Sequence, residues 1–116
     1  MAKTQLFIIT IGILTACSKD KTPTYSCHIS SIVSYQSTIK PIIQSKCNNC
    51  HNYPGVGGIY LDSFQMLHDL VINGSIYGVI HSQPNYVPMP PAGSPLFDSC
   101  ELANIDNWIA QGALNN

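Results

Sequence analysis

Apolar residues recur at helical spacing in three stretches of the chain. Within each stretch they are three, four or seven positions apart, which places them on one face of an α-helix. The three stripes are Ile39, Ile42 and Ile43; Phe64, Leu67 and Val71; and Leu102, Ile105 and Ile109, which Trp108 flanks. No stretch alternates apolar and polar residues as a half-buried β-strand would. The pattern therefore predicts an all-α fold.

Residues that start and stop helices bound each of these stretches. A serine or aspartate at the N-cap and a glycine just past the last turn are the usual signals. We expect one helix to follow Ser34, one to run from Asp62 or Ser63 to Asn73-Gly74, and one to run from a cap at Asp98 to about Ala110 before Gly112. A further turn is expected over residues 75–80. Pro41 lies inside the first stretch and should kink that helix or mark a short break.

One short motif follows the first predicted helix: Cys47-Asn48-Asn49-Cys50-His51. Two cysteines three positions apart, with histidine directly after the second, form the attachment pattern of c-type haem. On a helical turn both thiols lie on one face and can reach the two vinyl groups of one porphyrin edge. The next side chain, His51, can then bind the iron through an imidazole nitrogen. The motif predicts one covalently attached haem c.

Two other chemistries also use closely spaced cysteines. A structural zinc site needs four ligands, usually with a second cysteine or histidine pair at similar spacing, and the sequence has no such pair. A thioredoxin-like dithiol follows a strand in a βαβ pattern, whereas the residues before Cys47 are predicted to be helical. Both alternatives remain open, and the haem site is favoured over them.

A proline-rich loop offers a second iron ligand. Residues 83–95 contain five prolines, and Met89 stands between two of them. A stiff extended loop of this kind can present a thioether to a metal. His81, just before the loop, is the main rival ligand, and an open or water-bound iron is the third alternative. We expect Met66 and His68, within the second helix, to be packing or surface residues.

The loop after the motif is expected to orient the histidine. Residues 52–58 are rich in glycine and contain a proline, which predicts irregular structure. A ligating histidine usually donates its other ring N–H to a carbonyl or carboxylate. We therefore expect a backbone carbonyl of residues 52–58 to accept the Nδ1–H of His51.

The first residues have the features of an export signal. Lys3 precedes a short apolar run over residues 6–14, which is well below the ~20 residues needed to span a bilayer. Leu14-Thr15-Ala16-Cys17 resembles the bacterial lipoprotein signal box, in which the cysteine becomes the acylated mature N-terminus. An ordinary cleaved signal peptide is the alternative. An aspartate directly after the lipidated cysteine would resemble an inner-membrane retention signal. Ser18 stands at this position, so the outer membrane is favoured.

The expected organisation of the chain follows from this signal. Residues 1–16 are predicted to be a lipoprotein signal peptide, and residues 17–33 a lipidated N-terminus with a polar tether. Residues 34–116 are predicted to form one haem domain. A porphyrin at its centre would supply apolar surface that a domain of this size otherwise lacks.

Charge and composition exclude other functions. Only 9% of the residues are charged, arginine is absent, and the five lysines form no patch. We therefore expect no nucleic-acid partner. Nothing resembles a hydrolytic triad, a phosphate loop or a pair of catalytic carboxylates, so we do not expect an enzyme.

Taken together, these residues resemble the cytochrome c family over most of the chain that follows the signal. The segments that carry the likeness are the first helix with CNNCH, the Gly58-Ile59-Tyr60-Leu61 step, the Met-Pro-Pro turn at Met89, and Asn107-Trp108-Ile109-Ala110-Gln111-Gly112-Ala113. The chain is especially similar to short MPP-containing cytochrome domains of bacterial lipoproteins. The resemblance implies a small helical fold around one covalent haem. It also implies that Cys47 and Cys50 are attachment points, His51 the proximal ligand and Met89 the distal ligand.

The resemblance further implies that the first and last helices pack together near the haem edge. That crossing would bring Cys27 and Cys100 together, and an oxidising envelope compartment favours a disulfide between them. Two separately buried thiols are the alternative. The chain departs from mitochondrial-type cytochromes in its shorter span from His51 to Met89. It also lacks the lysine ring that guides docking in that type, so partner recognition must differ.

The expected function is that of an envelope-tethered mono-haem cytochrome. It would carry single electrons between redox protein partners, held to the membrane by its N-terminal lipid and facing the periplasm. The alternatives are a haem-based ligand-binding or sensor module with a labile sixth ligand, and a structural haem module of an envelope complex.

Overall fold

The computed structural model describes residue 27 and residues 29–116, and every regular element in this part of the chain is helical. In order along the chain, the elements are the π-helical turn η1 (Tyr35–Ile39), α1 (Lys40–Lys46), α2 (Asn48–His51), the 3-10 turn η2 (Val56–Gly58), α3 (Phe64–Ile72), α4 (Ser75–Ile80) and α5 (Ser99–Ala110). The described residues contain no β-strand, in agreement with the predicted all-α class. The predicted signal peptide and the lipidation site at Cys17 lie outside the described residues.

The first helical segment changes type at its proline. The Ser34 hydroxyl accepts the Ser37 N–H at 3.3 Å and so caps the segment as expected. The turn that follows is wide, since the Lys40 N–H bonds to the carbonyl of Tyr35. Pro41 then lies in the first turn of α1, where its missing N–H leaves no bond unmade. The predicted kink or break is thus a change from π-helical to α-helical geometry.

The middle of the chain forms two short helices in place of one helix and a turn. Ser63, not Asp62, caps α3, and its hydroxyl accepts the Met66 N–H at 3.4 Å. Asn73 ends α3, and Gly74 follows in the left-handed conformation with φ of 81°. Helix α4 starts directly afterwards, so the chain turns sharply between α3 and α4.

The last helix begins where the sequence predicted, and its buried face includes Trp108 together with Ile105 of the predicted stripe. Asp98 and Glu101 form a reciprocal capping box, with bonds of 2.8 and 2.9 Å. Ile105 and Trp108 are each only 1% exposed, whereas Leu102 and Ile109, expected in the buried stripe, are only half-buried. That part of the prediction was wrong, because the large indole occupies the centre of the interface, where burying it removes the most apolar surface from water.

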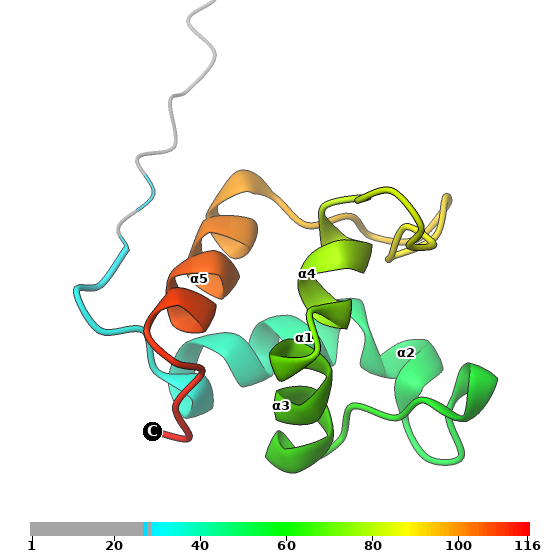
Figure 1. Cartoon of the computed structure of the whole chain (residues 1–116), viewed down its shortest axis with the longest axis horizontal. Helices are drawn as coiled ribbons and strands as arrows, with labels where there is room; N and C mark the ends of the chain where they lie inside the picture. Colours follow the sequence, from blue (N-terminus) through cyan, green and yellow to red (C-terminus); the bar gives the residue numbers. More distant parts are fainter. Residues whose placement is uncertain (1–26, 28) are drawn as a thin grey trace, which may run out of the picture.

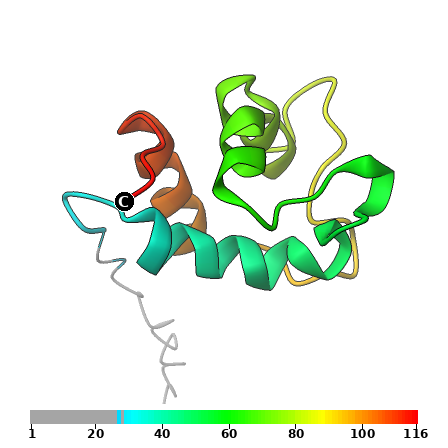
Figure 2. The same ribbon diagram turned by 90° about the horizontal axis from the view of Figure 1, so that it is seen from below.

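The helices pack on one side of a long base formed by η1 and α1. Figure 2 shows these two elements running end to end, with α5 over one end and α3 and α4 beside it. Tyr35 joins three elements, because its ring contacts Phe64 of α3 at 4.9 Å and Trp108 of α5 at 5.8 Å between centroids. The buried apolar residues that form the core are Val33, Tyr35, Ile39, Ile43, Leu61, Leu67, Val71, Ile76, Ile105, Trp108 and Ala113.

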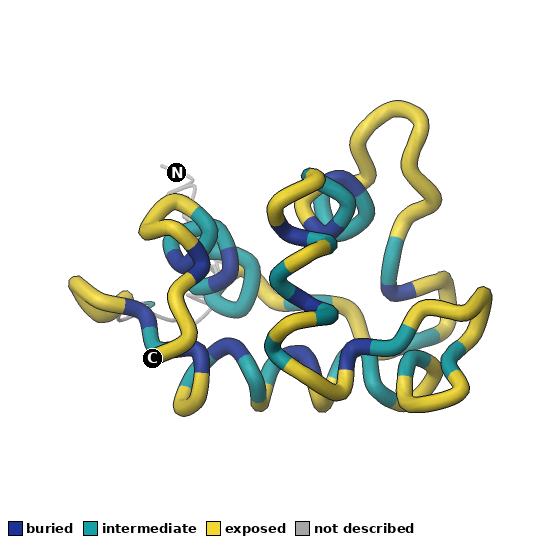
Figure 3. The backbone as a smooth tube through the Cα atoms, turned by 60° about the horizontal axis from the view of Figure 1, so that its bottom comes forward, coloured by how far each residue is buried: buried dark blue, intermediate teal, exposed yellow. Residues whose placement is uncertain are grey.

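Exposure is greatest in the connection between α4 and α5, which carries the proline-rich loop. Residues 82–88 are all exposed, whereas the buried positions lie where the helices face one another (Figure 3). The loop runs beside α2 at the opposite end of the molecule from the C-terminus (Figure 1). No helix of the described residues has the length and apolar character needed to cross a membrane.

Both ends of the described chain are tied to each other. Cys27 and Cys100 form a disulfide, with their Cα atoms 5.3 Å apart. Val33, which the sequence placed in the tether, is 2% exposed, and its N–H donates to Gln111 Oε1 at 2.9 Å. The Tyr35 N–H donates to Asn116 Oδ1 at 2.8 Å. These bonds hold η1 against α5. The candidate site described below lies at the other end of the base.

Candidate functional site

An apolar cavity of about 410 Å³ opens between α1, α4 and the two loops that follow α2 and α4. Its volume falls within the usual range for small-molecule and cofactor sites. The side chains that line it are those of Ile43, Cys47, His51, Ile59, Leu61, Leu70, Ser75, Ile76, Val79, Ile80, Tyr86, Val87, Met89 and Phe97. None of these described residues is charged. The cavity therefore suits a large apolar group with few polar attachments.

The cysteine motif forms a helical turn at one end of this cavity. The Cys47 N–H bonds to the carbonyl of Ile43 at 2.9 Å, and the His51 N–H bonds to the carbonyl of Cys47 at 2.9 Å. The motif thus continues from α1 with little interruption. Cys47 lines the cavity, while Cys50 is exposed and lines a smaller neighbouring cavity of about 140 Å³. Both thiols are free and open toward space that a bound group could fill.

The orientation of His51 is set by the loop that follows it. Its Nδ1 lies 3.0 Å from the carbonyl oxygen of Ile59. Because a carbonyl oxygen only accepts, Nδ1 must carry the hydrogen of this bond, and in the neutral ring Nε2 is then the nitrogen with the lone pair. The acceptor had been expected within residues 52–58, and it lies one residue beyond them. This is the arrangement that prepares a neutral imidazole to bind a metal.

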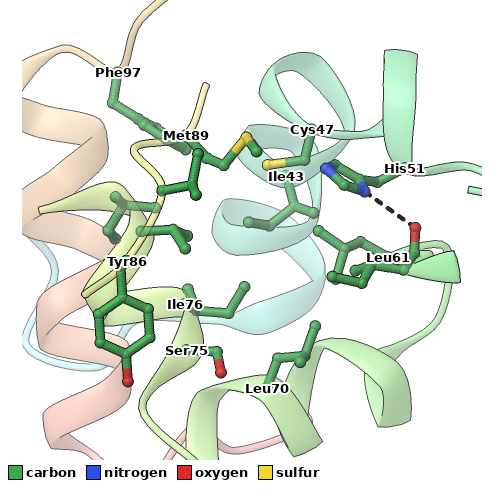
Figure 4. A pocket seen from close by; sticks show the side chains of 14 residues that line it. Ile43, Cys47, His51, Leu61, Leu70, Ser75, Ile76, Tyr86, Met89 and Phe97 are labelled. Atoms are coloured by element: carbon green, nitrogen blue, oxygen red, sulfur yellow. Dashed lines mark hydrogen bonds between the residues drawn. The ribbon is translucent and has the colours of Figure 1, made fainter. Parts of the chain in front are cut away.

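Met89 reaches the same place from the opposite wall. Its N–H bonds to the carbonyl of Val79 at 3.0 Å, which anchors the proline-rich loop to α4. Its half-buried side chain lines both cavities, as do those of Cys47 and His51. Figure 4 shows the Met89 sulfur pointing toward the Cys47 sulfur and the His51 ring. Three residues singled out from the sequence therefore meet at one point of the structure.

The rival ligands lie elsewhere. His81 Nε2 is 2.8 Å from Asp106 Oδ1 of α5, and its ring lies tilted against that of Tyr77, with centroids 4.4 Å apart. His68 rests on Phe64, with centroids 5.2 Å apart. Neither histidine lines either of the two cavities described above, and neither does Met66.

Burial gives Cys47 the wrong chemistry for a redox dithiol. It raises the pKa of the Cys47 thiol from its usual value of 9.0 to about 11, whereas reactive Cys-X-X-Cys pairs have a lowered pKa. The zinc alternative also lacks ligands, since no three histidine, cysteine, aspartate or glutamate side chains within residues 29–116 are grouped to hold a metal ion. A buried thiol beside an apolar cavity fits a covalent attachment point better than either alternative.

Lys46 is the one charged residue on the wall of the smaller cavity within the described chain, and its charge is already paired. Its Nζ lies 3.0 Å from Glu101 Oε2 and donates to the Leu96 carbonyl at 2.8 Å. This contact ties α1 to the start of α5 beside the cavity. It leaves the mouth of the site without an unpaired cation.

Two glycines at the site escaped the sequence analysis. A Cβ on Gly55 would overlap the Ile59 carbonyl, and a Cβ on Gly78 would meet the Tyr86 ring. Gly78 carried a usable signal, because an isolated glycine inside an apolar helical run usually has a packing reason. Gly55 carried none, since loops of this composition contain glycine for many reasons.

Comparison of the chain with protein-family models, with curated proteins and with solved structures found no match. The residues and their geometry are therefore the basis for the function proposed below.

Proposed function

We propose that this protein is a mono-haem c-type cytochrome that carries single electrons between redox partners at the cell envelope. The observation that carries the proposal is the meeting of Cys47, His51 and Met89 at one end of an uncharged apolar cavity. The helical fold, with its first and last elements in contact, is compatible with a cytochrome c-like arrangement. No catalytic group for bond chemistry is required.

The residues at the cavity fit a haem in their chemistry. Cys47 and Cys50 would hold it through thioethers, and His51 Nε2 and the Met89 sulfur would bind its iron. When bound, the haem would supply reversible one-electron chemistry between ferric and ferrous iron. Cys47, His51 and Met89 line both cavities, and Cys50 lines the smaller one.

The protein's own contribution is to position these groups and to exclude water. The Ile59 carbonyl holds the Nδ1–H of His51, which fixes the ring and raises its basicity as a ligand. The Val79 carbonyl holds the backbone of Met89. With haem bound, the apolar lining would disfavour the more highly charged ferric form, and a thioether ligand would act in the same direction. Both features support a carrier over a module with an open iron.

Two observations support the envelope location. The sequence of residues 1–17 has the features of a lipoprotein signal, and the Cys27–Cys100 disulfide is typical of an oxidising compartment. We expect mass spectrometry of the mature protein to find an acylated Cys17 at its N-terminus. An unmodified N-terminus at another residue would contradict this.

Retention of haem by the denatured chain tests the proposal directly. The protein is produced in a host that matures c-type cytochromes, denatured, and stained for haem on a gel. The wild type should retain haem, and Cys47→Ser with Cys50→Ser should lose it. The matched control is Cys27→Ser with Cys100→Ser, which removes as many sulfurs away from the cavity and should keep the stain. If acid acetone extracts the haem from the wild type, covalent attachment is refuted.

A further inference from the structure

We propose that Gly55 is a positioning residue for His51, acting through the carbonyl of Ile59. No side chain larger than hydrogen fits at residue 55 while that carbonyl stays in hydrogen-bonding position. The consequence for a bound haem rests on the function proposed above. The effect on the imidazole itself does not, because it concerns only this chain's own atoms.

The geometry of residues 51–61 leaves Gly55 no space for a Cβ. Gly55 has φ of 64°, and a Cβ built on it overlaps the carbonyl oxygen and carbon of Ile59. The carbonyl is held on both sides, because the Ile59 N–H bonds to Val56 O at 3.3 Å and the Leu61 N–H bonds to His51 O at 2.7 Å. The segment therefore cannot move as a rigid flap without breaking one of these bonds.

The overlapped carbonyl is the one that His51 uses. It accepts the Nδ1–H at 3.0 Å. To restore an ordinary van der Waals contact, the Ile59 carbonyl would have to move away from the new methyl group by on the order of 1 Å. A shift of that size is enough to take a hydrogen bond of this length outside the bonding range. Without its acceptor, the ring loses both the constraint on its tautomer and the increase in basicity that the bond supplies. Gly55 is thus required for the state of His51 that can ligate a metal.

The chain provides a control for a side chain at positive φ at Gly57. Gly57 has φ of 66° and ψ of 15°, in the left-handed region, and nothing lies within 4 Å of a Cβ built on it. Gly55 has a similar φ of 64° but ψ of 137°, which a side chain tolerates less well, so Gly55→Ala carries a larger backbone penalty. Only Gly55→Ala adds the overlap with Ile59. The state of the His51 ring, and not the stability of the two variants, therefore reports the carbonyl contact.

The experiment follows the His51 Nδ1–H by nitrogen-15 NMR in the full chain, in the reduced state if haem is bound. Wild type and Gly57→Ala should both show a slowly exchanging Nδ1–H, and Gly55→Ala should lose it. In haem-loaded protein, Gly55→Ala should also have a higher midpoint potential than Gly57→Ala, because a less basic imidazole stabilises ferric iron less. An unchanged His51 signal in Gly55→Ala overturns the proposal.

A folding failure of Gly55→Ala leaves a second route. Replacing Ile59 with glycine in the same chain lets the carbonyl move away from the new methyl group. Gly55→Ala with Ile59→Gly should then fold but lack the His51 signal, while Ile59→Gly alone should keep it. If the double variant keeps the signal, the proposal is wrong. Absence of haem from every variant would instead refute the proposed function, while the His51 comparison would still decide the role of Gly55.

Discussion

Replacing Gly78 with alanine sets two effects of opposite sign against each other. Gly78 is buried in α4, and a Cβ built on it lies 2.5 Å from three carbons of the Tyr86 ring. Helix propensity alone favours alanine over glycine by about 1 kcal/mol. Overpacking a filled site costs about 1–3 kcal/mol. The structure has to decide which effect wins.

The structure favours the packing cost, because the ring cannot easily turn aside. The three overlapped carbons include Cγ, the ring atom nearest the backbone. Rotation about the Cβ–Cγ bond leaves Cγ in place, so relief of the overlap needs a different χ1 rotamer or a shift of the backbone. Two backbone hydrogen bonds also hold the loop. The Tyr86 N–H donates to the Gln83 carbonyl at 3.1 Å, and the Gln83 N–H donates to the Gly78 carbonyl at 2.9 Å. We expect Gly78→Ala to lower the free energy of unfolding by about 1 kcal/mol, the packing cost less the propensity gain.

Urea unfolding of four proteins measures this: wild type, Gly78→Ala, Tyr86→Ala and the double variant. In the Tyr86→Ala background the overlap is gone, so Gly78→Ala should become stabilising by about 1 kcal/mol. The coupling between the two sites should therefore be about 2 kcal/mol. If Gly78→Ala stabilises the protein with Tyr86 intact, the reasoning is refuted.

Three further predictions test the site and the scaffold. Met89→Ala should open the haem to carbon monoxide, abolish the weak charge-transfer absorption of sulfur-ligated ferric haem and lower the midpoint potential. His81→Ala is the control and should leave these three properties unchanged. The opposite pattern would indicate two histidine ligands. Reducing the Cys27–Cys100 disulfide, which joins residues 73 positions apart, should lower the unfolding free energy by about 4 kcal/mol, and native protein whose two thiols alkylate without reduction would show that the bridge is absent. In the haem-free chain, alkylation of Cys47 should increase as the pH rises toward 11, because burial raises its pKa to about 11 and only the thiolate reacts; labelling that is already complete near the ordinary thiol pKa would contradict the burial.

The local features of this protein could be predicted from its residues alone. The caps at Ser34 and Asp98, the stop at Asn73-Gly74 and the helical turn of the cysteine motif all agree with the structure. Each depends on residues within about one helical turn of one another, where spacing and backbone preference decide the outcome. The haem proposal likewise begins from the spacing of Cys47, Cys50 and His51.

Which side chains meet across the fold follows only from the packing of distant segments. Met89 and His81 were both candidate ligands from the sequence. In the structure Met89 lines both cavities, whereas His81 Nε2 lies 2.8 Å from Asp106 Oδ1 of the distant α5. The face of α5 that is buried depends on where Tyr35 can stack on Trp108.

Gly55 and Gly78 show the same limit at the site itself. Their roles follow from the backbone of Ile59 and the ring of Tyr86, whose approach exists only after the loops close. Contacts of this kind depend on distances of a few tenths of an ångström between separate segments, because a packed interior has no spare volume to absorb an added methyl group. Local sequence patterns carry no information at that scale.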